Sequence, residues 1–293
     1  AKAAEELGLK EGTPVFGGCD DTQSACIGSG MNSDGDIHIY LGTSAWVGAA
    51  SRNKTQFKHG ASAIQSADID MNLIVGITEA AGSNIQWLIE QFFRQEQKEL
   101  GEGIYAYMDK VIETIPPGSD HLLCTPWMLG ERCPVSSTTT RATLFNIGPE
   151  HTREHLMRAV YEGIGYNLRW ILENFEKDYG FHCRQFRIIG GGALDDAWMQ
   201  IIADITGAEF AIVDNPRNAG ALGAAIIALI GLGELESFES AKQFVKESKT
   251  YRPNQANAYI YDEMFATYKR LFKSLKKTYY RANALRFGGG EDD

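Results

Sequence analysis

Short apolar runs typical of β-strands alternate with longer helical patterns in this sequence, and several runs end directly at glycines. Residues 37–41 lead into Gly-Thr-Ser, and residues 186–189 lead into three glycines. This alternation predicts an α/β fold. The other predicted strands are residues 14–16, 45–50, 71–77, 121–126 and 209–213. The predicted helices are residues 1–9, 24–28, 85–93, 104–115, 151–177, 198–205, 221–229 and 257–285.

The stretch of residues 17–28 combines two glycines, two adjacent carboxylates and a run of small side chains. It follows the predicted strand 14–16, and a carboxylate between a strand and a helix lies where ligands bind in open α/β sheets. Asp20 and Asp21 therefore have two interpretations. Either residue could cap the following helix, which Asp does well, or take part in catalysis. The spacing by itself favours the cap.

Three further segments have backbone suited to phosphates and a nucleoside. Gly-Thr-Ser at residues 42–44 offers N–H groups and a hydroxyl that suit phosphate oxygens. Small residues before Ile85 would let an anion approach a helix N-terminus, with Gly82 and Gln86 four residues apart on one side. Glycines 190–192 lack the side chains that would block a flat ring or a ribose. Considered alone, the Gly82 segment is explained better by a plain, close-packed amphipathic helix.

Length and composition exclude several classes of protein. The chain has 293 residues, of which 44% are hydrophobic and 23% charged, as in ordinary globular proteins. Its net charge of −10 argues against a nucleic-acid surface, which needs clustered Lys and Arg. No apolar run approaches the roughly 18 residues that indicate a membrane span, and the start of the chain lacks the pattern of a secretory signal.

Metal sites and disulfides are not expected. The five cysteines are odd in number and lack a C-x-x-C spacing, so a reducing cytoplasm fits best. His151 and His155 lie four residues apart on a predicted helix, but the glutamate of an H-E-x-x-H motif is missing. We therefore assign no metal ligands in this chain.

Several of these motifs together resemble the carboxyl-terminal domain of the FGGY family of carbohydrate kinases. The resemblance rests on residues 17–28, on Leu-Gly-Thr-Ser at 41–44, on Ala-Gly-Ser-Asn-Ile-Gln-Trp at 81–87 and on the segment 190–200. Gly-Glu-Arg-Cys-Pro at 130–134 matches a further family motif, although Glu131 and Arg132 could equally brace their loop. The resemblance covers about residues 12–233. It implies an actin-like ATPase lobe, in which a mixed, ribonuclease-H-like sheet is flanked by helices.

The resemblance also assigns roles to individual residues. The family's catalytic Asp falls on Asp21, with Asp20 as an additional neighbour, in a register that could be off by one. Residues that match the family's nucleotide site are Gly42 and Thr43 at the phosphates, and Gly82, Gln86, Gly190, Gly191 and Asp195 on the nucleoside side. Asp195 stands where some members have an Asn, so its contact with the adenosine is open.

The activity implied by the resemblance is transfer of the γ-phosphoryl group of ATP to a sugar or polyol hydroxyl, with Mg²⁺ accompanying the nucleotide. Xylulose is the first candidate substrate, followed by glycerol and gluconate. Residues 1–235 would form the nucleotide-side domain, and residues 236–293 its helical extension with a disordered tail. Two other classes stay open, namely a nucleotide-binding interaction module and a degenerate sugar sensor.

The same resemblance names the expected partners. These are ATP or ADP, a sugar or polyol, and the amino-terminal sugar-binding domain that family members carry. Without that domain the chain would be inactive. A homodimer is an open alternative, whereas no nucleic-acid or membrane partner is expected.

Overall fold

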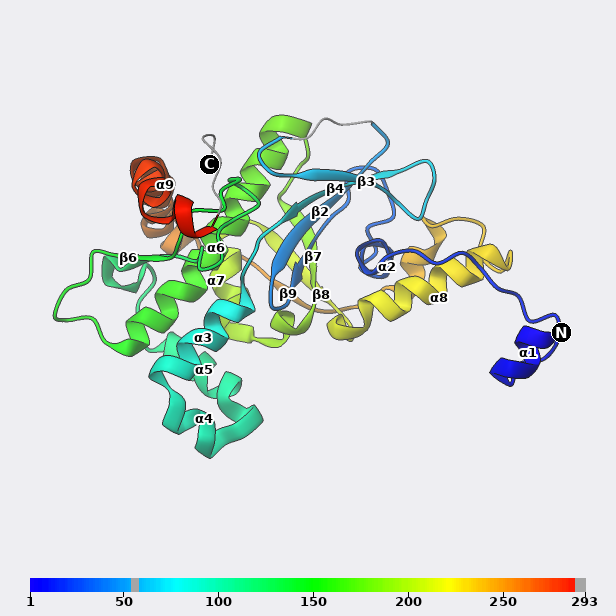
Figure 1. Ribbon diagram of the computed structural model, residues 1–293, viewed down its shortest axis with the longest axis horizontal. Coiled ribbons are helices and arrows are strands. Elements are labelled where there is room, and N and C mark those ends of the chain that lie inside the picture. The colour runs from blue at the N-terminus through cyan, green and yellow to red at the C-terminus, as the bar shows by residue number, and fades with distance from the viewer. Residues whose placement is uncertain (54–57, 288–293) are drawn as a thin grey trace.

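The described part of the chain, residues 1–53 and 58–287 of a computed structural model, contains a mixed seven-stranded sheet with helices on both faces (Figure 1). The strand order is β3-β4-β2-β1-β7-β8-β9. At the centre, β1 (Ile37–Leu41) runs parallel to β7 (Gln185–Ile189), and β7 runs parallel to β8 (Glu209–Val213). The remaining pairs in this sheet are antiparallel. The predicted α/β class is confirmed.

The other elements are distributed as follows. The remaining strands of the sheet are β2 (Ala45–Ser51), β3 (Ser62–Gln65), β4 (Asn72–Ile77) and β9 (Glu247–Tyr251), while β5 (Leu123–Thr125) and β6 (Thr143–Phe145) form a separate ribbon. The α-helices are α1 (Lys2–Leu7), α2 (Asp21–Gly28), α3 (Gly82–Phe92), α4 (Arg94–Leu100), α5 (Ile104–Glu113), α6 (Arg153–Tyr179), α7 (Asp196–Thr206), α8 (Ala219–Gly231) and α9 (Ala258–Phe287).

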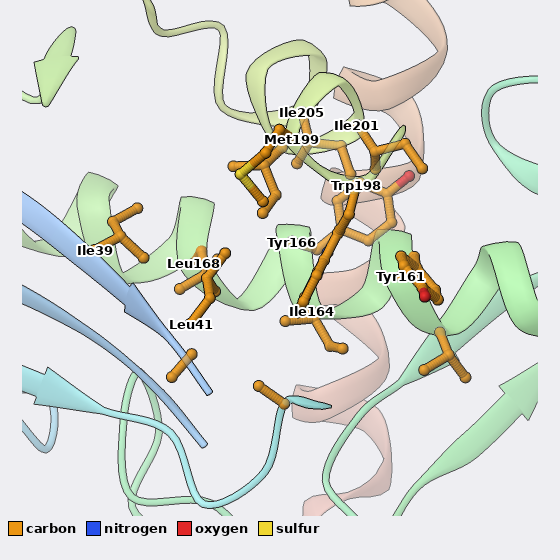
Figure 2. Close-up of a cluster of buried hydrophobic side chains, with 14 of the residues drawn as sticks. Ile39, Leu41, Tyr161, Ile164, Tyr166, Leu168, Trp198, Met199, Ile201 and Ile205 are labelled. Atoms are coloured by element: carbon orange, nitrogen blue, oxygen red, sulfur yellow. The ribbon is translucent and has the colours of Figure 1, made fainter. Parts of the chain in front are cut away.

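The sheet is buried on both faces, as strand β2 illustrates. Its side chains alternate between two cores, because successive residues of a strand point to opposite faces. Val47 and Ala49 contribute to the larger core with α6 and α7, whereas Trp46 and Ala50 contribute to the core with α2 and α8. Figure 2 shows part of the larger core, in which side chains from β1, α6 and α7 point toward one another. Burial on both faces explains the uninterrupted apolar and small residues of β2.

Helices α2 and α8 approach each other closely because both carry glycine at the contact. A Cβ atom on Gly28 would lie 1.8 Å from the carbonyl oxygen of Ala219, and one on Gly223 would lie 1.8 Å from that of Ser24. The later residue of α2 therefore meets the earlier residue of α8, so the two helices run antiparallel. The small-residue patterns in both segments reflect this packing.

The prediction of a strand at residues 14–16 is wrong. This segment has no regular secondary structure, and the side chains of Val15 and Phe16 are 87% and 39% exposed. The aromatic ring of Phe16 lies against Gly231 of α8 instead of beside a strand. An apolar run forms a strand only when a sheet edge is available to pair with it, and the edges of this sheet are β3 and β9.

The segment 236–293 is not only helical. Strand β9 lies within it and pairs with β8, so this segment extends the sheet before α9 begins. The stretch of residues 94–100, which lacks an apolar periodicity, forms α4. The expected disordered tail at residues 288–293 lies outside the described residues. Within residues 1–53 and 58–287, none of the helices combines the length and apolar character that a bilayer span requires.

The close contact of α2 and α8 predicts opposite effects for two glycines of α8. Gly223→Ala should lower the free energy of unfolding by about 3 kcal/mol, because the new methyl group overlaps the Ser24 carbonyl and forces the helices apart. Gly220→Ala is the matched control, since nothing lies within 4 Å of its added Cβ. It should be neutral or stabilise by up to about 1 kcal/mol through helix propensity. Urea unfolding measures both, and equal effects would contradict the close-packing argument.

Candidate functional site

A cavity of about 680 Å³ lies where β1 and β7 end, between α3, α5 and α7. Six residues with predicted nucleotide roles line it: Gly42, Thr43, Gly82, Gln86, Gly191 and Asp195. The carboxyl ends of parallel strands meet at one edge of a sheet, which is where open α/β sheets bind ligands. The structure thus brings together segments that are up to about 150 residues apart in the sequence.

The bend between β1 and β2 is fixed by the first turn of α3. The carbonyl of Thr43 accepts hydrogen bonds from the N–H groups of Ala81 and Ser83, at 2.9 and 3.1 Å, and the Gly42 carbonyl accepts one from Gly82 at 3.0 Å. A Cβ on Gly82 would lie 2.5 Å from the Gly42 oxygen, so only glycine fits. The expectation that an anion approaches the N-terminus of α3 is wrong, because these N–H groups already bind carbonyls of the bend. The exposed Thr43 lines the cavity instead.

The glycine bend after β7 reaches the same point from the other side. Gly190 has a φ of 94°, and a Cβ on it would lie 2.3 Å from the Leu41 carbonyl oxygen. It therefore supports the cavity from behind without lining it. Gly191 is exposed, and the nearest heavy atom to its added Cβ is Nε of Arg217 at 3.7 Å. Position 191 thus leaves open space facing the cavity.

Asp195 connects this bend to helix α7. One of its carboxylate oxygens accepts a hydrogen bond from the Trp198 N–H at 2.8 Å, which caps α7. The carboxyl group also lies within hydrogen-bonding reach of Asp109 on α5. Burial, followed by the contact with Asp109, raises the pKa of Asp195 well above its usual range.

The opposite wall of the cavity is polar. Tyr105 of α5 donates a hydrogen bond to Oε1 of Gln86 at 2.7 Å, and Nε2 of Gln86 donates to Glu90 at 2.7 Å. Both ends of the Gln86 amide therefore have protein partners. Of the described residues that line the cavity, Arg217 alone is cationic, against the carboxylates of Glu90, Glu102, Asp109 and Asp195.

The sequence motifs of the site do not contain Asp109, Tyr105 or Arg217. Asp109 and Tyr105 lie on the predicted helix 104–115, where polar residues are expected on the solvent side. Their role becomes visible only when α5 packs beside α7. Arg217 follows a strand and a proline, and a cation at the carboxyl end of a strand is the signal that could have identified it.

Asp20 and Asp21 have different surroundings. Asp20 is the N-cap of α2: its Oδ1 accepts the Gln23 N–H at 2.7 Å, while the Gln23 side chain accepts the Asp20 N–H at 3.1 Å. This capping box confirms the capping interpretation for Asp20. Asp21 is exposed and outside the lining of the cavity. Gly28, seven residues further along α2, contacts Ala219, so Asp21 lies about 10 Å along the helix from that contact.

The Gly-Glu-Arg loop is braced internally. Glu131 is 3% exposed and accepts N–H groups from Glu79 and Arg132, at 2.8 and 2.9 Å, and the amide of Asn167 at 2.6 Å. Burial raises its pKa to about 8. Arg132 forms an ion pair with Glu79 at 2.6 Å. These contacts bear out the bracing interpretation and tie the loop to α6 and to the segment before α3.

His151 and His155 both have protein partners. The ring of His155 contacts Asp120 at 3.1 Å, and Nδ1 of His151 accepts the Gly148 N–H at 2.8 Å. Within residues 1–53 and 58–287, no group of three or more His, Cys, Asp or Glu side chains is placed to hold a metal ion.

Comparison with known proteins identifies the family. Residues 37–232 match the C-terminal domain of the FGGY family of carbohydrate kinases. The chain belongs to this family. It is 32% identical over 276 residues to the xylulose kinase of Bacillus subtilis, which covers 93% of this chain and 53% of that protein. It is 25% identical over 279 residues to the gluconokinase of Bacillus licheniformis, covering 94% and 54%.

Solved structures of FGGY kinases share the fold. The xylulose kinase from Rhodospirillum rubrum superposes with a TM-score of 0.84 and 26% identity, over 96% of this chain and 55% of that one. The glycerol kinase of Plasmodium falciparum with ADP gives 0.73 and 20%, over 87% and 50%, which shows the fold alone. The expected actin-like ATPase fold is confirmed. The chain spans about half the length of the curated relatives it matches.

The environment of Glu131 predicts a loss of stability on substitution. Glu131→Gln should lower the free energy of unfolding by about 1–3 kcal/mol. The NH₂ group of Gln would take the place of a carboxylate oxygen that accepts an N–H group, so two donors would face each other. Asn167 cannot rotate to compensate, since its Oδ1 accepts from Trp127 and Tyr268. Urea unfolding at pH 9, above the raised pKa of Glu131 of about 8, measures the loss, because the ionised carboxylate then accepts all three N–H groups. The exposed Glu234→Gln is the control, and an equal effect in both would contradict the bracing role.

Proposed function

We propose that this chain is the nucleotide-side half of a kinase that transfers the γ-phosphoryl group of ATP to a sugar or polyol hydroxyl. The observation that carries the proposal is the convergence of Thr43, Gly82 and Gly191 on one cavity, in a chain of the FGGY family. Thr43 would contact the phosphates with Gly42, and Arg217 supplies a positive charge beside Gly191. Gly82, Gln86, Gly191 and Asp195 would lie on the nucleoside side, with Gly190 supporting the bend from behind.

Asp21 is the proposed general base. Because Asp20 is engaged in capping α2, Asp21 is the carboxylate of this pair that can accept a proton from a substrate hydroxyl. Phosphoryl transfer has a loose transition state, so the remaining contribution of the protein is mainly to position the reactants and stabilise charge. Mg²⁺ would be held largely by the nucleotide phosphates, as is usual for ATP-dependent enzymes.

The acceptor and the partner domain are also proposals. Xylulose is the first substrate to test, because the relatives at about 30% identity include several xylulose kinases. The chain spans about half of these relatives, and we propose that an amino-terminal sugar-binding domain is required for turnover. Activity in the cytoplasm fits the free cysteines found among the described residues.

Nucleotide binding is tested by filling the cavity at Gly191. Gly191→Val places a side chain in open space, so it should weaken ADP binding at least tenfold while leaving the free energy of unfolding within about 0.5 kcal/mol. Gly17→Val is the matched control, since nothing lies within 4 Å of its added Cβ and it lies outside the cavity lining. Calorimetric titration with ADP measures the affinity of both variants. Undiminished ADP binding by Gly191→Val would contradict the proposal that this cavity binds the nucleotide.

The catalytic base is tested by substituting each member of the aspartate pair in the intact protein. Asp21→Asn should lower kcat with xylulose by about 10²–10⁴-fold, because proton transfer to the base is lost. Asp20→Asn should retain both helix and kcat, since Asn caps as well as Asp. Coupled ADP release over a panel of pentoses, hexoses and polyols provides the measurement. Full activity in Asp21→Asn would show that the base is assigned wrongly.

A further inference from the structure

Three buried polar groups at the back of the cavity have no hydrogen-bond partner within the described part of the chain. They are Oδ1 of Asp109 on α5, the hydroxyl of Tyr161 on α6 and the indole N–H of Trp198 on α7. Tyr161 is fully buried, Trp198 is 2% exposed, and all three residues line the cavity. Buried polar groups are normally satisfied, so such a cluster requires an explanation.

The cluster surrounds the contact between Asp109 and Asp195. Two carboxylates within hydrogen-bonding reach cannot both be ionised at low cost in a buried setting, because their like charges repel. One proton held between them converts this repulsion into a hydrogen bond, in which one carboxyl group donates and the other accepts. Burial and the Asp109 contact both shift the pKa of Asp195 upward, which agrees with retention of a proton at neutral pH.

Other charged and titratable groups face the same cavity from each neighbouring element. They are Glu90 on α3, Glu102 before α5, Tyr105 on α5, Tyr161 on α6 and Arg217 before α8. The two glutamates add negative charge and so favour retention of the proton, whereas Arg217 opposes it. The Tyr161 hydroxyl lies within reach of the Asp195 carboxyl, where it lowers the pKa of Asp195 and, like Arg217, opposes retention of the proton.

We propose that Asp109 is a positioning residue that retains one proton on the Asp109–Asp195 pair, so that Asp195 meets a bound nucleotide as a neutral group. A neutral carboxyl group both donates and accepts a hydrogen bond, as a carboxamide does. It also keeps a double negative charge away from a polyanionic ligand. Nucleotide affinity is then high while the pair holds its proton and falls as pH rises and the proton is lost. This inference rests on the proposed function, that the cavity binds a nucleotide.

The test is a titration of the chain with ADP at several pH values between about 6 and 10. For the wild type, Kd should be constant at low pH and rise toward tenfold per pH unit once the pair loses its proton, because binding then requires uptake of one proton. Asp195→Asn mimics the neutral carboxyl group. Its Kd for ADP should therefore show no rise at high pH.

Asp109→Asn separates the positioning role from a merely structural one. Its amide can donate to an Asp195 carboxylate that stays ionised, so Kd should be raised at pH 7 and the rise with pH should disappear. Asp214→Asn, an exposed substitution outside the cavity lining, should keep the wild-type profile. A flat wild-type profile, or a wild-type profile in Asp109→Asn, would overturn the inference.

A second measurement does not depend on nucleotide. The infrared difference spectrum of wild type minus Asp195→Asn at pH 7 should contain the C=O band of a protonated carboxyl group, and its absence would overturn the shared proton. Failure of the wild type to bind ADP at every pH would instead contradict the proposed function, while this band would still report on the pair. If Asp109→Asn does not fold, Asp195→Asn and the band decide the outcome.

Discussion

The carboxyl end of β1 is the point on which the rest of the site depends, because backbone approaches it from two sides at distances that exclude any side chain. A Cβ on Gly190 would lie 2.3 Å from the Leu41 oxygen, and one on Gly82 would lie 2.5 Å from the Gly42 oxygen. These approaches hold the bend after β7 and the first turn of α3 against the same bend of the chain. Three backbone segments are packed together here, and Gly42, Gly82 and Gly191 line the part of the cavity that they form.

Three buried carboxyl groups of the fold have different kinds of partner. Glu131 receives three N–H donors, and it joins the loop before β6 to α6 and to the start of α3. Glu162 is paired with Arg158, which is also buried, at 2.8 Å. Asp195 has one N–H donor and a second carboxylate beside it. The first two arrangements stabilise the fold. Only Asp195 lies at the cavity, and its carboxyl group has the fewest hydrogen-bond donors of the three. Poorly satisfied, strongly perturbed groups are concentrated at functional sites.

The small helix α2 shows how packing divides the roles of two identical neighbours. Asp20 and Asp21 are the same residue type, but only the residue at the N-cap can accept the N–H groups of the first turn. The C-terminal end of α2 meets Ala219 of α8. Asp21 lies at the opposite, N-terminal end of α2. Asp21 is therefore presented on a surface outside the cavity. The chain spans about half the length of the curated relatives it matches.

The sequence by itself determined the α/β class, five of the seven strands of the sheet, most of the helices and the glycine bends that meet at the cavity, because these follow from local periodicity and from the backbone freedom of glycine. The two edge strands β3 and β9 were not predicted. Tertiary structure alone decided three other matters. Residues 14–16 are apolar but found no sheet edge, the N–H groups of α3 were taken by carbonyls of a distant bend, and Asp109 became part of the cavity only when α5 packed beside α7. Each depends on which segment lies next to which, and that proximity is set by packing across the whole chain and leaves no signal in the local pattern of residues.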